Sequence, residues 1–333
     1  MIAPAVHASC VAALTPVAAS ARRCFLDLPG TRAAHDEAFA AVPAFREVEV
    51  GGGGVAAAGD GLRVAAWNLE RCLYPEAAAA LLRRAGANLL LLSEMDVGCQ
   101  RTGQRHTIGE LAGLLGYRYG FALEFLELRA MRMPNQGADS GAGNRLGFHG
   151  NGFATGLPFT DPVVIRLDEV ADWFRSPKGG EKRIGTRIAV AATFDVGKRQ
   201  VVACSVHLES AADAAGRALQ MRTLLDALDG YARDRPVVIG GDLNVHVRAG
   251  RHDDPGEPLF AETAARGYDW RHCNAAMPTT RPSQWSAGAG ACQLDWFCTR
   301  GLIAETPLTI PALGDDGTVL SDHDLITVVL TPV

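Results

Sequence analysis

The sequence lacks several features that mark whole classes of protein. It holds no run of about eighteen apolar residues, so no membrane-spanning helix is expected. None of its eight cysteines forms a CxxC pair, which argues against a zinc site or a disulfide framework. Acidic residues outnumber basic ones, with 37 Asp and Glu against 32 Lys and Arg. This balance argues against a protein that coats nucleic acid through bulk charge.

One segment near the N-terminus has a faint likeness to the apolar core of a secretory signal. Residues 8–20 are apolar, but no Lys or Arg precedes them and Pro16 interrupts them. We therefore interpret this segment as a capped or fraying N-terminal helix. The cysteines are expected to be reduced thiols that are mostly buried, and the chain is predicted to be cytoplasmic.

What the sequence does contain is the composition of a folded protein. Hydrophobic residues make up 48% and charged residues 21%, which excludes a disordered chain and predicts one large domain or two small ones. Residues 1–60 are Ala-rich and include four glycines at 51–54. We interpret them as an N-terminal extension that packs on the core, covers an edge strand, forms part of a cleft or is partly flexible. Residues 61–333 are predicted to form the main domain.

Short apolar segments and amphipathic segments follow one another through the main domain. The expected strands cover residues 62–67, 88–94, 152–157, 186–196, 200–208, 236–244, 293–299 and 324–331, and the expected helices cover 75–86, 107–116 and 214–232. Strands outnumber helices, and hairpins mix with βα units. This pattern predicts an α/β fold, a four-layer sandwich of two mixed, mostly antiparallel sheets packed face to face with helices outside. Four long loops are expected at the rim of a cleft, at residues 129–150, 171–186, 246–258 and 274–292.

Polar side chains stand at the ends of these apolar strands. They are Asn68, Glu70, Glu94, Asp96, His207, Asp242, Asn244, Asp295, Asp322 and His323. One strand that ends in a carboxylate is unremarkable, but so many such ends are hard to explain as solvated caps. Strand ends of a sandwich meet at one edge, where crowded carboxylates repel each other unless a cation neutralises them. Oxygen ligands with few histidines favour Mg²⁺ or Mn²⁺ over Zn²⁺.

The residues around these strand ends form six ordered motifs. They are WNLER (67–71), LSEMD (92–96), SVHLES (205–210), GGDLN (240–244), LDWF (294–297) and SDHDLI (321–326). In this order they resemble the successive motifs of the endonuclease/exonuclease/phosphatase superfamily. That superfamily includes abasic-site endonucleases, the pancreatic deoxyribonuclease, neutral sphingomyelinases, inositol polyphosphate phosphatases and deadenylases. The resemblance covers residues 62–331. Each motif alone is weak, whereas the ordered combination is specific.

The resemblance implies a divalent metal site that binds Mg²⁺ or Mn²⁺. Glu94 matches the metal-binding glutamate of the superfamily. Asn68 matches the asparagine that supports the metal and the phosphate. Glu70 stands where some members carry an acidic neighbour of the metal, and Asp322 is a further ligand or supports one. The implied metal residues are therefore Glu94, Asn68, Asp322 and Glu70.

The resemblance also implies a set of catalytic residues. Asp242 matches the aspartate that positions or deprotonates the attacking water, and Asn244 matches the asparagine that holds the phosphate. His207 matches a histidine that contacts the phosphate or the leaving group. His323 matches the histidine that stabilises the transition state, and Asp295 matches the carboxylate that orients it.

Three further residues are candidates for substrate binding. Asn151 begins a strand of small residues and is predicted to contact the phosphate, with a role in a turn as the alternative. Residues 175–187 hold five basic residues, which more often form a solvated loop. In this sequence they are also candidates to bind a substrate anion, with Arg183 and Arg187 as the contacts.

These observations together predict a divalent-metal-dependent phosphoesterase that uses water as its nucleophile. A small molecule or a lipid headgroup is the favoured substrate, because the net charge is −5 and no basic, aromatic-rich arm for duplex DNA is evident. A nuclease that acts on DNA or RNA is the first alternative. A non-catalytic protein that binds a phosphorylated partner is the second. The fold does not decide among these substrates.

Overall fold

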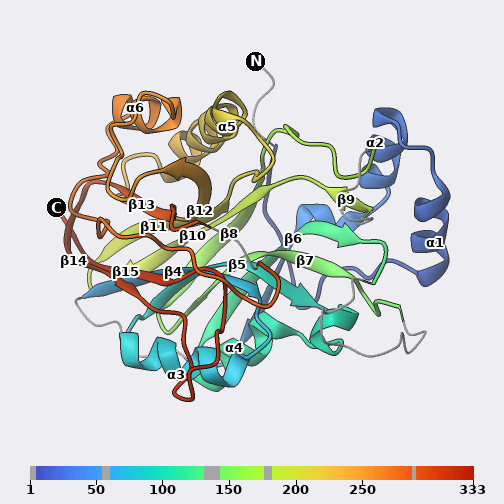
Figure 1. Ribbon diagram of the computed structural model, residues 1–333, viewed down its shortest axis with the longest axis horizontal. Coiled ribbons are helices and arrows are strands. Elements are labelled where there is room, and N and C mark those ends of the chain that lie inside the picture. Colours follow the sequence, from blue (N-terminus) through green and yellow to red (C-terminus); the bar gives the residue numbers. More distant parts are fainter. Residues whose placement is uncertain (1–4, 55–60, 131–142, 176–181, 287–289) are drawn as a thin grey trace.

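Two mixed β-sheets face each other and helices cover their outer sides, which is the predicted four-layer α/β-sandwich (Figure 1). The computed structural model describes residues 5–54, 61–130, 143–175, 182–286 and 290–333. Parts of three of the predicted loops therefore lie outside the described residues, and so does the predicted boundary at residue 60.

The first sheet has six strands among the described residues, in the spatial order β1-β8-β10-β11-β12-β13. Their bounds are β1 Ala5–His7, β8 Phe159–Arg166, β10 Ile188–Val196, β11 Arg199–His207, β12 Val237–Val247 and β13 Gln293–Arg300. Strands β10 and β11 form the predicted hairpin, in which Val196 pairs with Arg199 across a two-residue turn that includes Gly197. Strands β11 and β12 are parallel, and β13 returns antiparallel to β12.

The second sheet has the order β14-β15-β4-β5-β7-β6-β3-β2, and β9 pairs with β6 as well. The bounds are β14 Leu302–Ile310, β15 Leu325–Pro332, β4 Leu62–Arg71, β5 Leu89–Val97, β7 Phe148–Thr155, β6 Arg118–Glu127, β3 Glu47–Gly52, β2 Ser9–Val11 and β9 Arg183–Gly185. Strands β4 and β5 are parallel neighbours at the centre of this sheet.

The helices begin and end where the sequence places its punctuating residues. Their bounds are α1 Ala19–Asp27, α2 Arg32–Ala40, α3 Pro75–Ala85, α4 Thr107–Leu115, α5 Ala214–Ala232 and α6 Pro258–Ala265. Pro75 opens α3, and left-handed glycines cap α3 and α4 at Gly86 and Gly116. The side chain of Asp213 caps α5 by accepting from the Gly216 N–H. Helices α5 and α6 cover the six-stranded sheet, while α3 and α4 cover the other (Figure 1).

The hydrophobic core has three layers, one between the sheets and one under each set of helices. Val64, Phe153, Val190 and Phe297 belong to the layer between the sheets and are all buried. Because both faces of each central strand are covered, the strands appear in the sequence as continuous apolar runs.

The expectation of a helix over residues 8–20 is wrong. Strand β2 occupies Ser9–Val11 and pairs in parallel with β3, and the first helix begins only at Ala19. Side chains of β3 also hold the segment that follows, because Glu49 accepts from the Leu14 N–H and Glu47 accepts from the Thr15 N–H. Tertiary pairing therefore overrides the helical propensity of the alanines.

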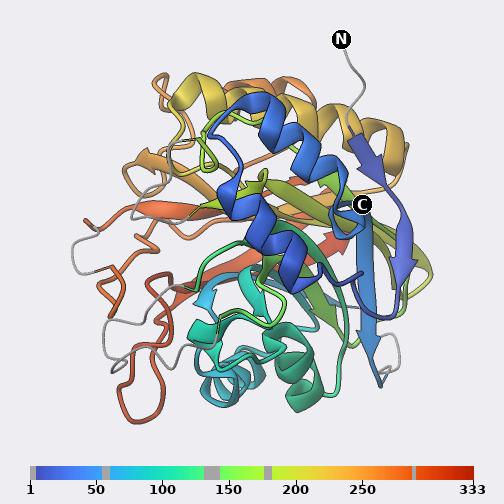
Figure 2. The ribbon, with the colours of Figure 1, turned by 90° about the vertical axis from the view of Figure 1, so that its right-hand side faces the viewer.

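Residues 5–52 add edge strands to both sheets on the same side of the sandwich. Strand β1 pairs with β8 in the six-stranded sheet, and β3 pairs with β6 in the other. Strands β3 and β8 contact each other across the sandwich, so the two additions lie together. Figure 2 shows α1 and α2 of this segment lying across that side of the molecule.

No helix among the described residues is both long enough and apolar enough to cross a membrane. All eight cysteines are free thiols. Five of them are buried, which agrees with the sequence-based expectation.

Candidate active site

The polar strand ends meet at one edge of the sandwich and come from both sheets. In the six-stranded sheet, His207 pairs in register with Asp242, which in turn pairs with Asp295. In the other sheet, Asn68 on β4 and Glu94 on β5 lie at the register shift between these two paired strands. The Asn68 Nδ2 donates to Asp242 Oδ2 at 3.0 Å and so links the two sheets directly.

The backbone is irregular where these strands deliver their side chains. Glu70, Glu94 and Asn244 have φ values of 45°, 55° and 51°, in the left-handed region that side chains other than glycine rarely adopt. The pairing registers of β4, β5 and β12 shift at the same places. Such bulges turn a side chain away from the regular alternation of a strand, and backbone strain of this kind concentrates at functional sites.

Asp242 lies at the centre of the cluster with 1% of its surface exposed. Its Oδ1 accepts from the Asn244 N–H at 2.9 Å. Its Oδ2 lies 3.6 Å from Nε2 of His207 and 3.7 Å from Nε2 of His323. Both distances are longer than a hydrogen bond, so the Asp242 carboxylate faces two imidazoles and is hydrogen-bonded to neither.

His323 is held by a buried carboxylate in the way that orients a catalytic imidazole. Its Nδ1 lies 2.7 Å from Asp295 Oδ2, which also accepts from the Thr279 hydroxyl at 2.6 Å. Burial alone would lower the pKa of His323, but the carboxylates of Asp295 and Asp242 outweigh it and raise the pKa well above its usual value. This raised pKa favours the cationic form of His323, in which Nε2 is a donor that faces Asp242. The indole of Trp67 fixes this segment by donating to the His323 carbonyl at 2.8 Å.

His207 is flanked by a second buried carboxylate that the sequence analysis did not identify. Its Nδ1 lies 3.5 Å from Glu124 Oε2, on β6. Arg187 Nη1 contacts Glu124 Oε1 at 2.5 Å, and its Nε donates to Glu209 Oε2 at 3.1 Å. The only sequence signal for Glu124 is a charged residue inside the apolar run FALEFLEL.

Carboxylates crowd the side of the cluster where the metal is predicted. Glu94 Oε1 accepts from Asn68 Nδ2 at 3.3 Å, and Glu94 Oε2 pairs with Arg71 Nη1 at 2.8 Å. Glu70 Oε2 accepts from the Asp322 N–H at 3.2 Å. Burial, together with repulsion from Asp322, raises the pKa of Glu70 to about 7. Buried oxygen donors that lack sufficient positive charge fit a hard divalent cation such as Mg²⁺ or Mn²⁺.

Asn68 supports this donor set through its amide nitrogen. Its Nδ2 donates to Glu94 and Asp242, while its Oδ1 accepts from the Glu70 N–H at 3.1 Å. In this arrangement the amide holds the carboxylates together, and direct ligation of a cation by Asn68 stays a prediction.

Arg71 and the loop that contains Ser283 and Trp285 also border the site, and sequence reasoning did not identify them. Arg71 pairs with Glu94, and its guanidinium lies 5.3 Å from the ring of Trp285. In the same loop the Ser283 hydroxyl donates to Glu70. The Arg71 that ends the WNLER motif is thus the cation nearest to the predicted metal ligand, a position that spacing along the sequence does not reveal.

The three predicted substrate contacts occupy different surroundings. Asn151 is fully buried on β7, donates to the Ile188 carbonyl at 3.3 Å, and leaves its Oδ1 without a hydrogen bond among the described residues. Arg187 is held between two carboxylates beside His207. Arg183 stacks 4.0 Å from the Trp173 ring and 4.6 Å from the Phe125 ring. Substrate binding by all three stays a prediction.

Glu94→Gln is expected to raise the Mn²⁺ concentration needed for half-saturation by at least about tenfold, since the cation loses a charged ligand. Isothermal titration calorimetry with Mn²⁺ measures this directly. Glu76→Gln is the matched control, because the Glu76 side chain is 68% exposed. A titration that does not change in the Glu94 variant would show that the ion is held elsewhere.

Fold and site together define a class of protein, an α/β-sandwich hydrolase whose acidic and histidine residues meet at one edge of two sheets. Residues 65–323 match the model of the Endonuclease/Exonuclease/phosphatase family, which is more than half of the chain. The chain belongs to this family, whose members are metal-dependent phosphoric ester hydrolases, and it is an enzyme of that kind. No relative among curated proteins matches the sequence.

Several solved structures share the fold. An endonuclease/exonuclease/phosphatase from Beutenbergia cavernae DSM 12333 is 21% identical, with 82% of this chain and 72% of that chain covered and a TM-score of 0.58. The catalytic domain of human Nocturnin with bound sulfate anion is 17% identical, with 82% and 94% covered and a TM-score of 0.55. TDP2 from D. rerio, complexed with single strand DNA product, is 15% identical, with 81% and 99% covered and a TM-score of 0.51. At these identities the likeness shows the fold alone.

Proposed function

We propose that this chain hydrolyses a phosphodiester or phosphomonoester of a small molecule or lipid headgroup, with Mg²⁺ or Mn²⁺ and with water as nucleophile, in the cytoplasm. One observation carries the proposal: the buried Asp242 carboxylate faces two imidazoles within 3.7 Å, beside a group of carboxylates suited to a cation. The free thiols support a reducing compartment.

The residues around Asp242 supply acid, base and orientation. Asp242 accepts a proton from the water that attacks the phosphorus in this proposal. His323 is cationic and donates from Nε2 to a phosphoryl oxygen as negative charge develops there. Asp295 keeps the imidazole of His323 in the tautomer and direction that this donation needs, through the 2.7 Å contact at Nδ1. His207 faces the same space from the adjacent strand, and Asn244 is the predicted phosphate contact.

Glu94, Asp322 and Glu70 are the residues that would hold the metal, with Asn68 linking Glu94 to Asp242. A divalent ion bound there neutralises charge on the phosphate and on the leaving oxygen. Raised pKa values support this assignment, since burial raises that of Glu70 and that of Asp322, and a cation would relieve the repulsion between them.

Charge and pairing support a small substrate over a nucleic acid. The chain carries a net charge of −5, and the guanidinium groups of Arg187 and Arg101 are buried in ion pairs. Neither guanidinium is displayed as part of a surface stripe that would follow a phosphate backbone. The alternative, a nuclease, is supported by the shared fold with D. rerio TDP2, which is described in complex with single strand DNA product.

A mixed panel tests the proposal directly. Purified protein is incubated with and without Mg²⁺ or Mn²⁺ on sphingomyelin, a nucleotide diester, sugar phosphates, a chromogenic phosphodiester, plasmid DNA and single-stranded RNA. We expect metal-dependent release of product from the small or lipid esters. Cleavage confined to DNA or RNA, with salt-sensitive binding, would favour the nuclease. Failure to hydrolyse any member of the panel with either metal would overturn the proposal.

A further inference from the structure

The N-terminal segment touches the active-site region through two stretches of chain, residues 167–175 and 182–187, which we call the active-site wall. Strand β9 of this wall pairs with residues 125–127 of β6, and β3 pairs with residues 118–121 of the same strand. The N-terminal segment and the wall therefore share one edge of the nine-stranded sheet. This segment lies outside residues 65–323, the part that matches the family.

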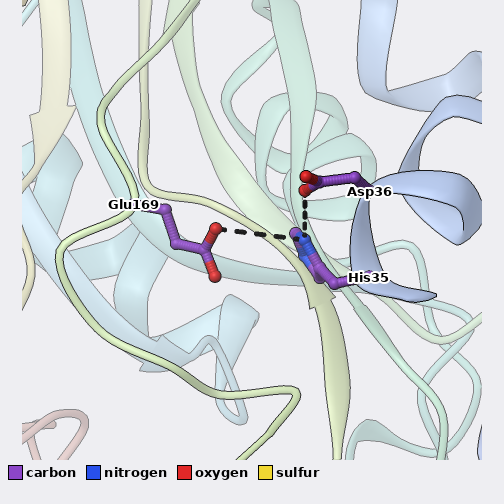
Figure 3. Close-up of side chains that lie close together, drawn as sticks. All are labelled: His35, Asp36 and Glu169. Carbon is purple, nitrogen blue, oxygen red and sulfur yellow. Dashed lines mark hydrogen bonds and ion pairs between the residues drawn. The ribbon is translucent and has the colours of Figure 1, made fainter. Parts of the chain in front are cut away.

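His35, on α2, contacts both stretches of the wall, at Gly185 and at Glu169, and Figure 3 shows the contact with Glu169. Its Nε2 accepts the backbone N–H of Gly185 at 3.2 Å. Its Nδ1 lies 3.2 Å from Asp36 Oδ1 and 4.0 Å from Glu169 Oε2. Arg32, also on α2, forms an ion pair with the same glutamate, with its Nη1 2.8 Å from Glu169 Oε2. The side chains of His35 and Glu169 are only 4% and 9% exposed, whereas Asp36 and Arg32 face the solvent.

The group formed by His35, Asp36 and Glu169 has the residue types of a cation site, but its hydrogen bonds argue against one. Because Nε2 accepts from Gly185, the ring proton of a neutral His35 lies on Nδ1, the atom that would have to bind the cation. A cation at Nδ1 would move that proton to Nε2, where it would meet the Gly185 N–H. Arg32 already places a positive charge against both carboxylates. We therefore assign this group a structural role, in which it holds α2 against the active-site wall.

Two further cationic side chains, Lys182 and Arg166, donate hydrogen bonds to backbone carbonyls of the N-terminal segment. Lys182 Nζ donates to the carbonyls of Leu26 and Leu28 at 2.9 and 2.6 Å, and lies 4.4 Å from the Phe174 ring. Arg166 donates to the Phe45 carbonyl at 2.6 Å and to the Leu123 carbonyl at 2.6 Å. The two hydrogen bonds of Lys182 therefore connect the wall to the N-terminal segment independently of His35.

The wall carries side chains that reach the catalytic cluster. Gly185 lies two residues before Arg187, whose guanidinium contacts the His207 ring nitrogens at 2.9 and 3.0 Å. The Trp173 indole donates to Glu209 Oε2 at 2.9 Å, and Glu209 is the second carboxylate that holds Arg187. A shift of the wall would therefore move Arg187 and Arg183, the predicted substrate contacts, while Asp242 and its strand stay in place.

We propose that residues 14–49 form a brace that positions the active-site wall, and that His35 is the positioning residue at its centre. The inference rests on the proposed function, because it assigns the wall a part in binding the phosphoester. Substrate recognition then depends on a segment outside the family match, while the groups that perform the chemistry lie within it.

The test compares His35→Leu, which removes the acceptor, with His35→Gln, whose amide oxygen replaces Nε2. Amide exchange of peptides that cover residues 182–188 is expected to rise at least about tenfold in His35→Leu and to stay near wild type in His35→Gln. On the phosphoester that the wild type hydrolyses, KM is expected to rise at least about fivefold in His35→Leu, with kcat within about twofold. His7→Leu, on β1 of the same segment, is the control and should change neither quantity.

Lys182→Met provides a second variant in case His35→Leu does not fold, since it loses two hydrogen bonds but keeps its stem on Phe174. The same changes in exchange and in KM are expected. Unchanged exchange and KM in the variants would overturn the brace. A fall in kcat at constant KM would also overturn it, because a smaller folded fraction produces that pattern. If the wild type hydrolyses no phosphoester, the proposed function fails, and the exchange measurement alone decides the brace.

Discussion

Replacing Asp242 with asparagine is expected to lower kcat by at least ~10²-fold, because the amide cannot take a proton from the attacking water. The variant keeps the shape of the side chain and the hydrogen bond from the Asn244 N–H. Its contact with Asn68 weakens, at a cost of about 1–3 kcal/mol, which a folded domain normally tolerates. Turnover at saturating metal, with circular dichroism to verify the fold, measures the effect.

The matched control is Asp253→Asn, which makes the same chemical change at an exposed aspartate paired with Arg251. It should leave turnover within about twofold of wild type, as surface substitutions away from special contacts do. Turnover near the wild-type value in the Asp242 variant would remove Asp242 from the role of base. A parallel loss in both variants would point to a general effect of the lost charge.

Arg187→Met is expected to destabilise the protein by about 3–5 kcal/mol at neutral pH, because it leaves two buried carboxylates without their cation. Burial alone would raise the pKa values of Glu124 and Glu209, but Arg187, together with His207 beside Glu124 and Trp173 beside Glu209, lowers both to about 2. Urea unfolding followed by tryptophan fluorescence measures the loss. Arg222→Met is the control, since its pair with Glu262 is largely open to water and contributes less than about 1 kcal/mol.

The stability lost in Arg187→Met should also depend on pH, because the pKa values of Glu124 and Glu209 are lowered in the folded protein. The two carboxylates have an ordinary pKa of 4.5 and a lowered pKa in the folded protein. Their pairing therefore stabilises the wild type fully above pH 4.5 and is lost as the pH falls toward about 2. The stability gap between wild type and Arg187→Met should narrow over that interval. A gap that is constant with pH would show that Arg187 stabilises the fold through packing alone.

The sequence revealed the family, the layered fold and the strand-end residues because each of these has a local signature. Pro75 and Gly86 bracket α3, and the apolar runs before Asn68 and Asp242 are the doubly covered strands β4 and β12. The ordered motifs then indicated which residues meet. The convergence of Asn68 and Asp242 from different sheets agrees with that expectation.

Other parts depend on contacts that no local pattern encodes. Strand β8 was missed because Pro162 and the exposed residues beside it obscure the alternation, and β6 because the buried Glu124 interrupts an apolar run. The alanine-rich segment at 8–20 favours a helix until pairing with β3 is available. The left-handed backbone at Glu94 is set by the bulge in β5, and the neighbouring strand decides its position.

The hydrogen bond from Asn68 to Asp242 crosses from one sheet to the other. A fragment confined to the six-stranded sheet would hold Asp242 without Glu94, and one confined to the other sheet would hold the reverse. The two sheets also approach closely at Gly240 on β12, where an added methyl group would lie 3.0 Å from the side chain of Leu91, on β5 of the other sheet. The site therefore depends on the distance between the two sheets. A side chain in place of Gly240 would change that distance and shift Asp242 relative to Asn68 and Glu94.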